Sequence, residues 1–355
     1  MWIFDGHLDL AMNALIWNRD LNIPVHEQRQ LEVEAGLARA GYGRGTVAFP
    51  EMRKGEVAVT IATLIARVQK PGNPFPGFRA SEIAFAAAQG QLAYYRMLDE
   101  QGVVRILPDL PALHAHIREW EAAPATTPLG IILTMEGADP VVYPEQIHRW
   151  KADGLRCIGL THYGTGNYAA GTSTVGGLTD LGRAILPEIK QAGLVLDLTH
   201  LADQAFWEVL ERFDGPVQCS HQCCRALVPD DRQMDDDQLR AVIERGGVIG
   251  AALDAWMLHP GWVKGVTENS VCDLGAMVDH IDHVCQLAGN SHHSAIGTDL
   301  DGGYGQEQTP HDLDTIADLQ KVPELLRARG YTEDDVQNIM HGNLVRLFER
   351  AWSSV

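Results

Sequence analysis

The chain has 355 residues, of which 45% are hydrophobic and 21% charged, and its formal net charge is −19 at pH 7. This composition is typical of a globular protein with a large core, and it excludes disordered and fibrous chains. The negative charge repels phosphate groups and anionic lipids, so we expect neither nucleic acid nor a membrane surface as a partner.

Short apolar runs alternate with longer amphipathic stretches along the chain, which is typical of repeated βα units around a parallel sheet. Strands buried on both faces are near-continuous apolar runs. The runs that we interpret as barrel strands are residues 2–4, 57–64, 130–135, 156–161, 194–198, 216–219, 247–252 and 294–297. Eight parallel strands predict an α/β fold, the (β/α)8 or TIM barrel, as a single domain over residues 1–355 with loop insertions.

Other segments are assigned around these strands. Residues 103–107 are a further apolar run, which we interpret as an accessory strand or part of an excursion before the third barrel strand. Residues 70–77 are rich in Pro and Gly and predict a surface loop, which could overhang an active site. Capping boxes at Asp235 and Thr332 predict the starts of two helices.

The N-terminal segment and the cysteines bear on the cellular compartment. Residues 1–7 have no basic region, and no stretch reaches the ~20 apolar residues of a membrane-spanning helix, so we expect no signal peptide and a cytoplasmic protein. The six cysteines are dispersed without any C-x-x-C pair. We expect buried free thiols rather than disulfides or a zinc knuckle.

The residues that carry chemistry follow the apolar runs. Six times a run ends in His, Asp or Glu, and these residues are His7, Asp9, Glu136, His162, His200, His221 and Asp299. The carboxyl ends of all strands in a (β/α)8 barrel meet at one mouth, so these distant residues should become neighbours. A single histidine at a strand end is more often a hydrogen-bonded structural residue than a metal ligand. So many polar groups at the ends of neighbouring strands, however, would be costly to bury without a bound cation.

The predicted ligands are imidazoles and carboxylates without a thiolate, which suits zinc and also manganese, cobalt or iron. Two ions account for the number of ligands better than one. If Glu136 bridges them, with His7 and Asp9 on one side and His200 and His221 on the other, every predicted ligand is used. A water held by both ions would become hydroxide near neutral pH and attack a carbonyl group.

A proton shuttle completes this chemistry. Asp299, at the last strand, can take the proton from the water and deliver it to a departing amine. Asp301 competes for this role, but a residue at the strand end is better aimed than one in the loop.

Six short motifs resemble those of the renal (membrane) dipeptidase family of the amidohydrolase superfamily. They are residues 5–9 (DGHLD), 136–137 (EG), 160–162 (LTH) with Asn167, 197–200 (DLTH), 220–221 (SH) and 297–302 (GTDLDG). The resemblance continues to residues 341–346 (HGNLVR) and so covers almost the whole chain. Most members of that superfamily begin with His-x-His, whereas His-x-Asp with a bridging Glu resembles the dipeptidase branch.

The resemblance implies a zinc-dependent dipeptidase with specific site residues. It implies that His7 and Asp9 bind one zinc ion, that His200 and His221 bind the other, and that Glu136 bridges them. It also implies that His162 contacts the scissile carbonyl or its tetrahedral intermediate, and that Asp299 shuttles the proton. The residues that it places at the substrate are His162, Asn167 and Arg232.

Arg232 would anchor the substrate carboxylate, a role that a bidentate guanidinium suits. Arg232 lies in an acidic run, however, so Arg225 stays open as the alternative anchor. The expected substrate is a dipeptide, including one with a D-residue at the carboxyl side, and a homodimer is a further expectation from similar proteins. Two other functions stay open: a related amidohydrolase of N-acyl amino acids, lactones or β-lactam amides, and a catalytically silent barrel that binds a partner.

Overall fold

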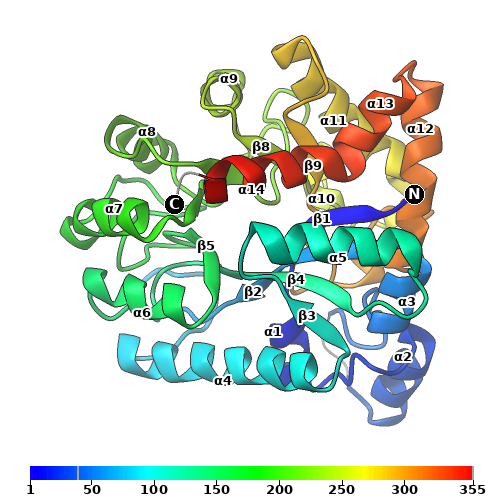
Figure 1. Ribbon diagram of the computed structural model, residues 1–355, viewed down its shortest axis with the longest axis horizontal. Coiled ribbons are helices and arrows are strands. Elements are labelled where there is room, and N and C mark those ends of the chain that lie inside the picture. The colour runs from blue at the N-terminus through cyan, green and yellow to red at the C-terminus, as the bar shows by residue number, and fades with distance from the viewer. Residues whose placement is uncertain (38–39, 354–355) are drawn as a thin grey trace.

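The structure, a computed structural model, describes residues 1–37 and 40–353. Its parallel strands form one sheet in the order β2-β1-β9-β8-β7-β6-β5-β4-β3, and β2 also pairs with β4. This last pairing closes eight strands into a barrel with helices around it (Figure 1), as the sequence predicts. The barrel strands are β1 (Ile3–Leu8), β2 (Val57–Leu64), β4 (Leu129–Met135), β5 (Leu155–Gly159), β6 (Val195–Asp197), β7 (Val217–Cys219), β8 (Val248–Ala251) and β9 (Ser294–Ile296).

The ninth strand, β3 (Val104–Ile106), lies outside the closed ring. It pairs with residues 129–131 of β4, whereas β5 pairs with residues 133–135 of β4. The other edge of β4 pairs directly with β2, from Val59 with Gly130 to Leu64 with Met135. The accessory role predicted for residues 103–107 is therefore confirmed.

Strand β1 is longer than the predicted run of residues 2–4, because its polar side chains find partners inside the barrel. The carboxylate of Asp5 accepts hydrogen bonds from the backbone N–H of Thr298 at 2.9 Å and from its hydroxyl at 2.6 Å. This carboxylate also accepts from the backbone N–H of His7 at 3.2 Å. His7 consequently lies within β1, beside the segment that follows β9, rather than after the strand.

Helices cover the outside of the barrel (Figure 1). Their apolar faces are buried in the hydrophobic core. The longer ones are α2 (Val25–Glu34), α4 (Ser81–Glu100), α5 (Leu110–Ala122), α7 (Asp180–Ala192), α8 (Asp203–Arg212), α9 (Asp236–Glu244), α11 (Leu274–Ala288) and α14 (Asn343–Ser353). The shorter ones are α1 (Leu10–Leu15), α3 (Phe49–Lys54), α6 (Ile147–Ala152), α10 (Ala255–Leu258), α12 (Val322–Ala328) and α13 (Glu333–Gln337). The capping boxes predicted at Asp235 and Thr332 form and begin α9 and α13.

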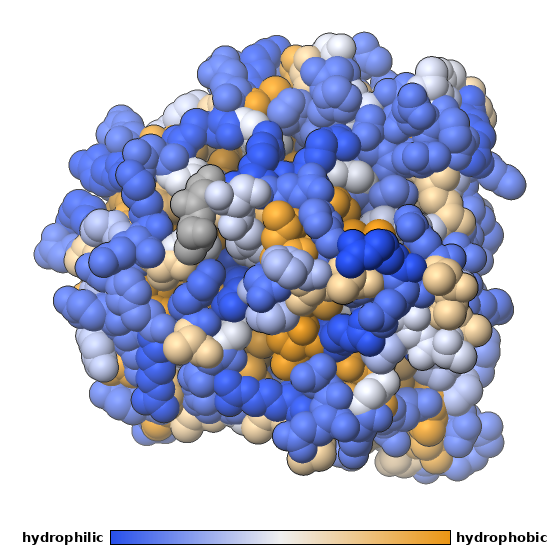
Figure 2. All heavy atoms as spheres, viewed as in Figure 1, coloured by the Kyte–Doolittle hydropathy of each residue, from blue (hydrophilic) through white to orange (hydrophobic). Residues whose placement is uncertain are grey.

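The surface and the thiols agree with the composition. Hydrophilic residues cover most of the face seen in Figure 2, with hydrophobic residues between them in smaller groups. All six cysteines are buried and free, as expected. Among the described residues, no helix combines the length and the apolar character that crossing a membrane requires.

Candidate active site

The side chains that follow the strands converge on the carboxylate of Glu136, the residue directly after β4. Its Oε1 lies 3.3 Å from Nε2 of His200 and 3.5 Å from Nε2 of His221. The Nε2 atoms of His162 and His7 lie 3.6 Å and 3.7 Å from the same oxygen. Residues from β1 and from the loops after β4, β5, β6 and β7 thus meet at the mouth of the barrel.

Two further carboxylates complete the cluster around His7. Nε2 of His7 lies 3.9 Å from Oδ1 of Asp9 and 3.8 Å from Oδ1 of Asp299. These separations exceed a hydrogen bond, but two atoms that each bind one zinc ion at about 2.0–2.2 Å lie about 3–4 Å apart. Nε2 of His7 and Oε2 of Glu136 are also buried without a hydrogen-bond partner. Orphaned donor and acceptor atoms at this spacing fit metal ions.

Three groupings of these residues offer ligand atoms close enough for one ion. They are His7, Asp9 and Glu136; Glu136, His162 and His200; and His7, His221 and Asp299. The Nε2 atoms of His200 and His221 also face each other at 3.0 Å. The groupings overlap at His7 and at Glu136, so these two residues are common to the candidate ligand sets.

Hydroxyl groups contact the Nδ1 atoms of three of these imidazoles. Oγ of Ser220 lies 3.2 Å from Nδ1 of His7 and 2.9 Å from Nδ1 of His221. Oγ1 of Thr172 lies 3.0 Å from Nδ1 of His200. Partners of this kind orient the ring and leave Nε2 available to a metal. Sequence reasoning did not single out either hydroxyl.

The charges in the cluster favour a bound cation. Burial raises the pKa of Asp9 to about 6, with help from the charge of Glu136, and burial raises the pKa of Asp299 well above its usual value. Burial lowers the pKa of His200 to about 3, and the charge of Arg232 adds to this effect. The charges of Glu136, Asp9 and Asp299 outweigh the effect of burial on His7 and raise its pKa to about 10. A divalent cation among these carboxylates would stabilise their ionised forms.

Two residues of the cluster have left-handed backbones, which are uncommon outside glycine. The φ angles of His200 and Asp299 are 68° and 55°. Such conformations cost about 1–3 kcal/mol and persist where the surrounding structure holds them. They turn both side chains toward the mouth directly after β6 and β9.

Arg67 belongs to this site, although sequence reasoning missed it. Its Nη1 lies 3.0 Å from Nδ1 of His162, and its guanidinium packs 5.1 Å from the centre of the Phe75 ring. Phe75 lies within the predicted loop of residues 70–77, and its ring centre is 6.2 Å from that of His162. The loop therefore overhangs the site, and Arg67 is the polar residue that follows the apolar run of β2.

The two candidate anchors for a substrate carboxylate differ in position. Arg232 is buried, and it donates to the backbone carbonyl of His221 at 2.8 Å and to Oε1 of Gln222 at 2.9 Å. Arg225 forms a two-point pair with Asp203 at 2.8 and 3.0 Å, outside the cluster. Of these two candidates, Arg232 is the one that contacts a residue of the cluster.

Asn167, which the resemblance places at the substrate, makes hydrogen bonds to two neighbouring segments. Its side-chain amide donates to the hydroxyl of Ser81 at 2.8 Å, at the start of α4. Its backbone N–H donates to Asp139 at 2.8 Å, and the same carboxylate accepts from the backbone N–H of Val68 at 2.7 Å. Asp139 thus connects the loop after β5, which contains Asn167, to the segment that carries Arg67.

Asp301, the competitor for the proton shuttle, is part of the core. Its carboxylate pairs with Arg19 at 3.2 Å and accepts from the hydroxyl of Thr46 at 2.7 Å and the backbone N–H of Val47 at 3.0 Å. These contacts occupy both carboxylate oxygens of Asp301. Asp299, not Asp301, lies beside His7.

Asp254 is a second residue that sequence reasoning missed. It follows β8 and is buried, and its Oδ1 has no hydrogen-bond partner. Burial raises its pKa to about 6. Its charge also contributes to the raised pKa values of Asp299 and Tyr163, so it lies near the same mouth.

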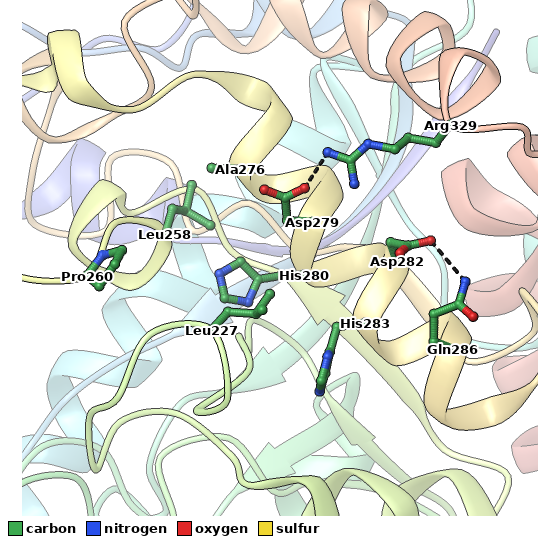
Figure 3. A pocket seen from close by; sticks show the side chains of 10 residues that line it. All are labelled: Leu227, Leu258, Pro260, Ala276, Asp279, His280, Asp282, His283, Gln286 and Arg329. Carbon is green, nitrogen blue, oxygen red and sulfur yellow. Dashed lines mark hydrogen bonds and ion pairs between the residues drawn. The ribbon is translucent and has the colours of Figure 1, made fainter.

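A separate pocket of about 390 Å³ shares no residue with the cluster (Figure 3). It lies along α11, where Asp279 pairs with Arg329 and Gln286 donates to Asp282. His280 lines it from the inner side and accepts from a backbone N–H at 2.9 Å through its Nδ1. These contacts give this helix face a structural role.

The fold and the cluster fit one class of protein, a metal-dependent hydrolase built on a (β/α)8 barrel. The chain belongs to the membrane dipeptidase family, peptidase family M19, whose family model matches residues 1–353. This membership identifies the chain as a metallodipeptidase.

Similar proteins include other dipeptidases. Dipeptidase aclJ of Aspergillus oryzae is 25% identical over 353 residues, which are 97% of this chain and 76% of that protein. Dipeptidase 3 of Homo sapiens is 28% identical over 178 residues, which are 50% of this chain and 34% of that protein. The chain thus matches about a third of the length of Dipeptidase 3.

Solved structures share the fold at lower identity. The crystal structure of a metallopeptidase from Rhodobacter sphaeroides, liganded with a phosphinate mimic of the dipeptide L-Ala-D-Ala, superposes with a TM-score of 0.79 at 21% identity over 99% of both chains. The crystal structure of the dipeptidase AC gives a TM-score of 0.78 at 22% identity, again over 99% of both chains.

Proposed function

We propose that the chain hydrolyses the peptide bond of dipeptides with two zinc ions at the mouth of the barrel. In this proposal His7 and Asp9 hold one ion, His200 and His221 hold the other, and Glu136 bridges them. The observation that carries the proposal is the position of Glu136, whose Oε1 lies 3.7 Å from Nε2 of His7 and 3.3 Å from Nε2 of His200. Its Oε2 is buried without a partner and remains free for a cation.

Two divalent ions bound there would lower the pKa of water to near neutrality and polarise the carbonyl group that is attacked. Asp299 lies at the same mouth, with its Oδ1 3.8 Å from Nε2 of His7, so its carboxylate is placed to exchange a proton with a water bound there. It would take the proton from the attacking water and pass it to the departing amine. His162 would contact the carbonyl oxygen, and Arg232 would hold the carboxylate of the substrate through donors that its two hydrogen bonds leave free.

The proposed substrate class is supported by the family of the chain and by the ligand of one similar structure. The metallopeptidase from Rhodobacter sphaeroides binds a phosphinate mimic of L-Ala-D-Ala. This ligand supports dipeptides with a D-residue at the carboxyl side as substrates of the present chain. We also propose a cytoplasmic location and a homodimer, which cell fractionation and sedimentation equilibrium would test.

A dipeptide library assay tests the proposal. The purified enzyme should release free amino acids, lose this activity after treatment with a chelator, and regain it when Zn²⁺ is added back. N-acyl amino acids and lactones serve as matched substrates, because the same barrel and metals would act on them. Turnover of these compounds far above that of every dipeptide, or dipeptide cleavage that ignores metal removal, would overturn the proposal.

A further inference from the structure

The contact between Arg67 and His162 determines which ring nitrogen of His162 carries a proton. Nη1 of Arg67 lies 3.0 Å from Nδ1 of His162. A guanidinium has only N–H donors and no acceptor, so Nδ1 must accept this hydrogen bond with its lone pair. His162 is therefore the neutral tautomer with its proton on Nε2.

The neighbouring imidazoles are held differently. Nδ1 of His7, His200 and His221 each faces a hydroxyl, and a hydroxyl can accept as well as donate. The Ser220 hydroxyl has one hydrogen for two imidazoles, so it accepts from at least one of them. These rings can keep the proton on Nδ1 and offer the lone pair of Nε2 to a metal, whereas His162 cannot.

The free N–H of His162 points into the mouth of the site. Its Nε2 lies 3.6 Å from Oε1 of Glu136, and its side chain remains 12% exposed. Of the imidazoles around Glu136, this one therefore offers a hydrogen-bond donor to a substrate rather than a ligand to a metal.

The loop of residues 70–77 fixes Arg67 in this position. The backbone carbonyl of Arg67 accepts from the N–H of Phe78 at 2.7 Å, and Gln69 donates to the carbonyl of Phe78 at 2.7 Å. The ring of Phe75 covers the guanidinium at 5.1 Å. Apart from the contact with His162, no hydrogen bond or ion pair of the Arg67 side chain is found among the described residues.

We propose that Arg67 is a positioning residue, which fixes the tautomer of His162 so that Nε2–H donates to the oxygen of the scissile carbonyl. The role at the carbonyl rests on the proposed dipeptidase function, while the tautomer does not depend on it. The donor matters most when negative charge develops on that oxygen, because a fixed dipole in a buried site stabilises the transition state more than the ground state.

Nuclear magnetic resonance of the metal-loaded enzyme labelled with [15N]histidine tests the tautomer directly. The signals of His162 are assigned by their loss in the H162N variant. We expect the ¹⁵N shift of Nδ1 to be that of an unprotonated nitrogen and the shift of Nε2 that of a protonated one. A proton on Nδ1, or on both nitrogens, would overturn the proposal even if the enzyme cleaves no dipeptide.

Kinetics of Arg67 variants test the consequence for catalysis. R67M should lower kcat by about 10- to 100-fold through misplacement of the donor and change KM by less than about 3-fold. R67K should keep a larger share of kcat, because an ammonium group also only donates. R212M, which removes an exposed arginine that contacts Glu211, is the control and should match the wild type. Wild-type kcat in R67M, or equal losses in R67M and R67K, would contradict the role of Arg67.

Discussion

Replacement of Ser220 by alanine tests how the cluster holds its metals. The hydroxyl of Ser220 contacts Nδ1 of His7 at 3.2 Å and Nδ1 of His221 at 2.9 Å, and these residues are proposed ligands of different ions. Its backbone N–H donates to Asp197 at 3.1 Å, so the chain path should survive the loss of the hydroxyl. S220A should therefore weaken both ions together.

The size of the effect follows from the lost contacts. A buried N–H left without an acceptor costs about 1–3 kcal/mol, and the loss of such an outer partner typically lowers metal affinity about 10- to 100-fold. We expect a loss in this range at each ion in S220A. The matched variant T172V removes the hydroxyl that contacts His200 at 3.0 Å, so it should weaken the binding of one ion.

Equilibrium dialysis of the metal-free enzyme against zinc buffers, with metal analysis, gives the affinity and the number of ions for each variant. The account predicts two weakened sites in S220A and one in T172V. Wild-type affinity at both sites in S220A would refute the reasoning that the Ser220 hydroxyl supports ligands of both ions.

Three other changes have defined outcomes. Asp299→Asn should keep both ions and lower kcat by about 10²- to 10⁴-fold in steady-state assays; unchanged turnover would remove Asp299 from the proton transfer. Arg19→Met should lower the free energy of unfolding in urea by about 3–5 kcal/mol, because Asp301 would stay buried without its cation at 3.2 Å; wild-type stability would contradict this. Burial lowers the pKa of His280, whose Nδ1 accepts from Cys224, from 6.5 to about 4. The folded protein holds His280 neutral, so the free energy of unfolding is unaffected by this group above pH 6.5. It falls by about 3 kcal/mol as the pH drops from 6.5 toward 4, because the unfolded chain takes up the proton first. The difference in unfolding free energy between the wild type and His280→Gln should shift by that amount across this window, and a difference independent of pH would count against it.

The barrel and the meeting point of the polar residues could be predicted because both follow from strand periodicity. Apolar runs mark strands buried on both faces, and the carboxyl ends of parallel strands share one mouth. The same rule places Glu136 beside His200 and His221, far apart in sequence. The length of β1 could not be read in this way, because Asp5 interrupts the apolar run and is satisfied only by Thr298 across the sheet.

The missed residues fall into two groups. Arg67 and Asp254 follow β2 and β8 at the register that identified the other site residues, and a search for every polar type at strand ends would have found them. Ser220 and Thr172 depend on loop paths that bring a hydroxyl behind an imidazole, and no periodicity encodes such paths. The substrate role of Asn167 stays a prediction, and its amide donates to Ser81 at 2.8 Å.

The most direct test of the central claim is a crystal structure of the zinc-loaded enzyme with anomalous scattering measured at the zinc edge. The account predicts two peaks, one bonded to His7 and Asp9 and the other to His200 and His221, with the carboxylate of Glu136 between them. A single peak, or a zinc ion bonded to His162, would contradict it.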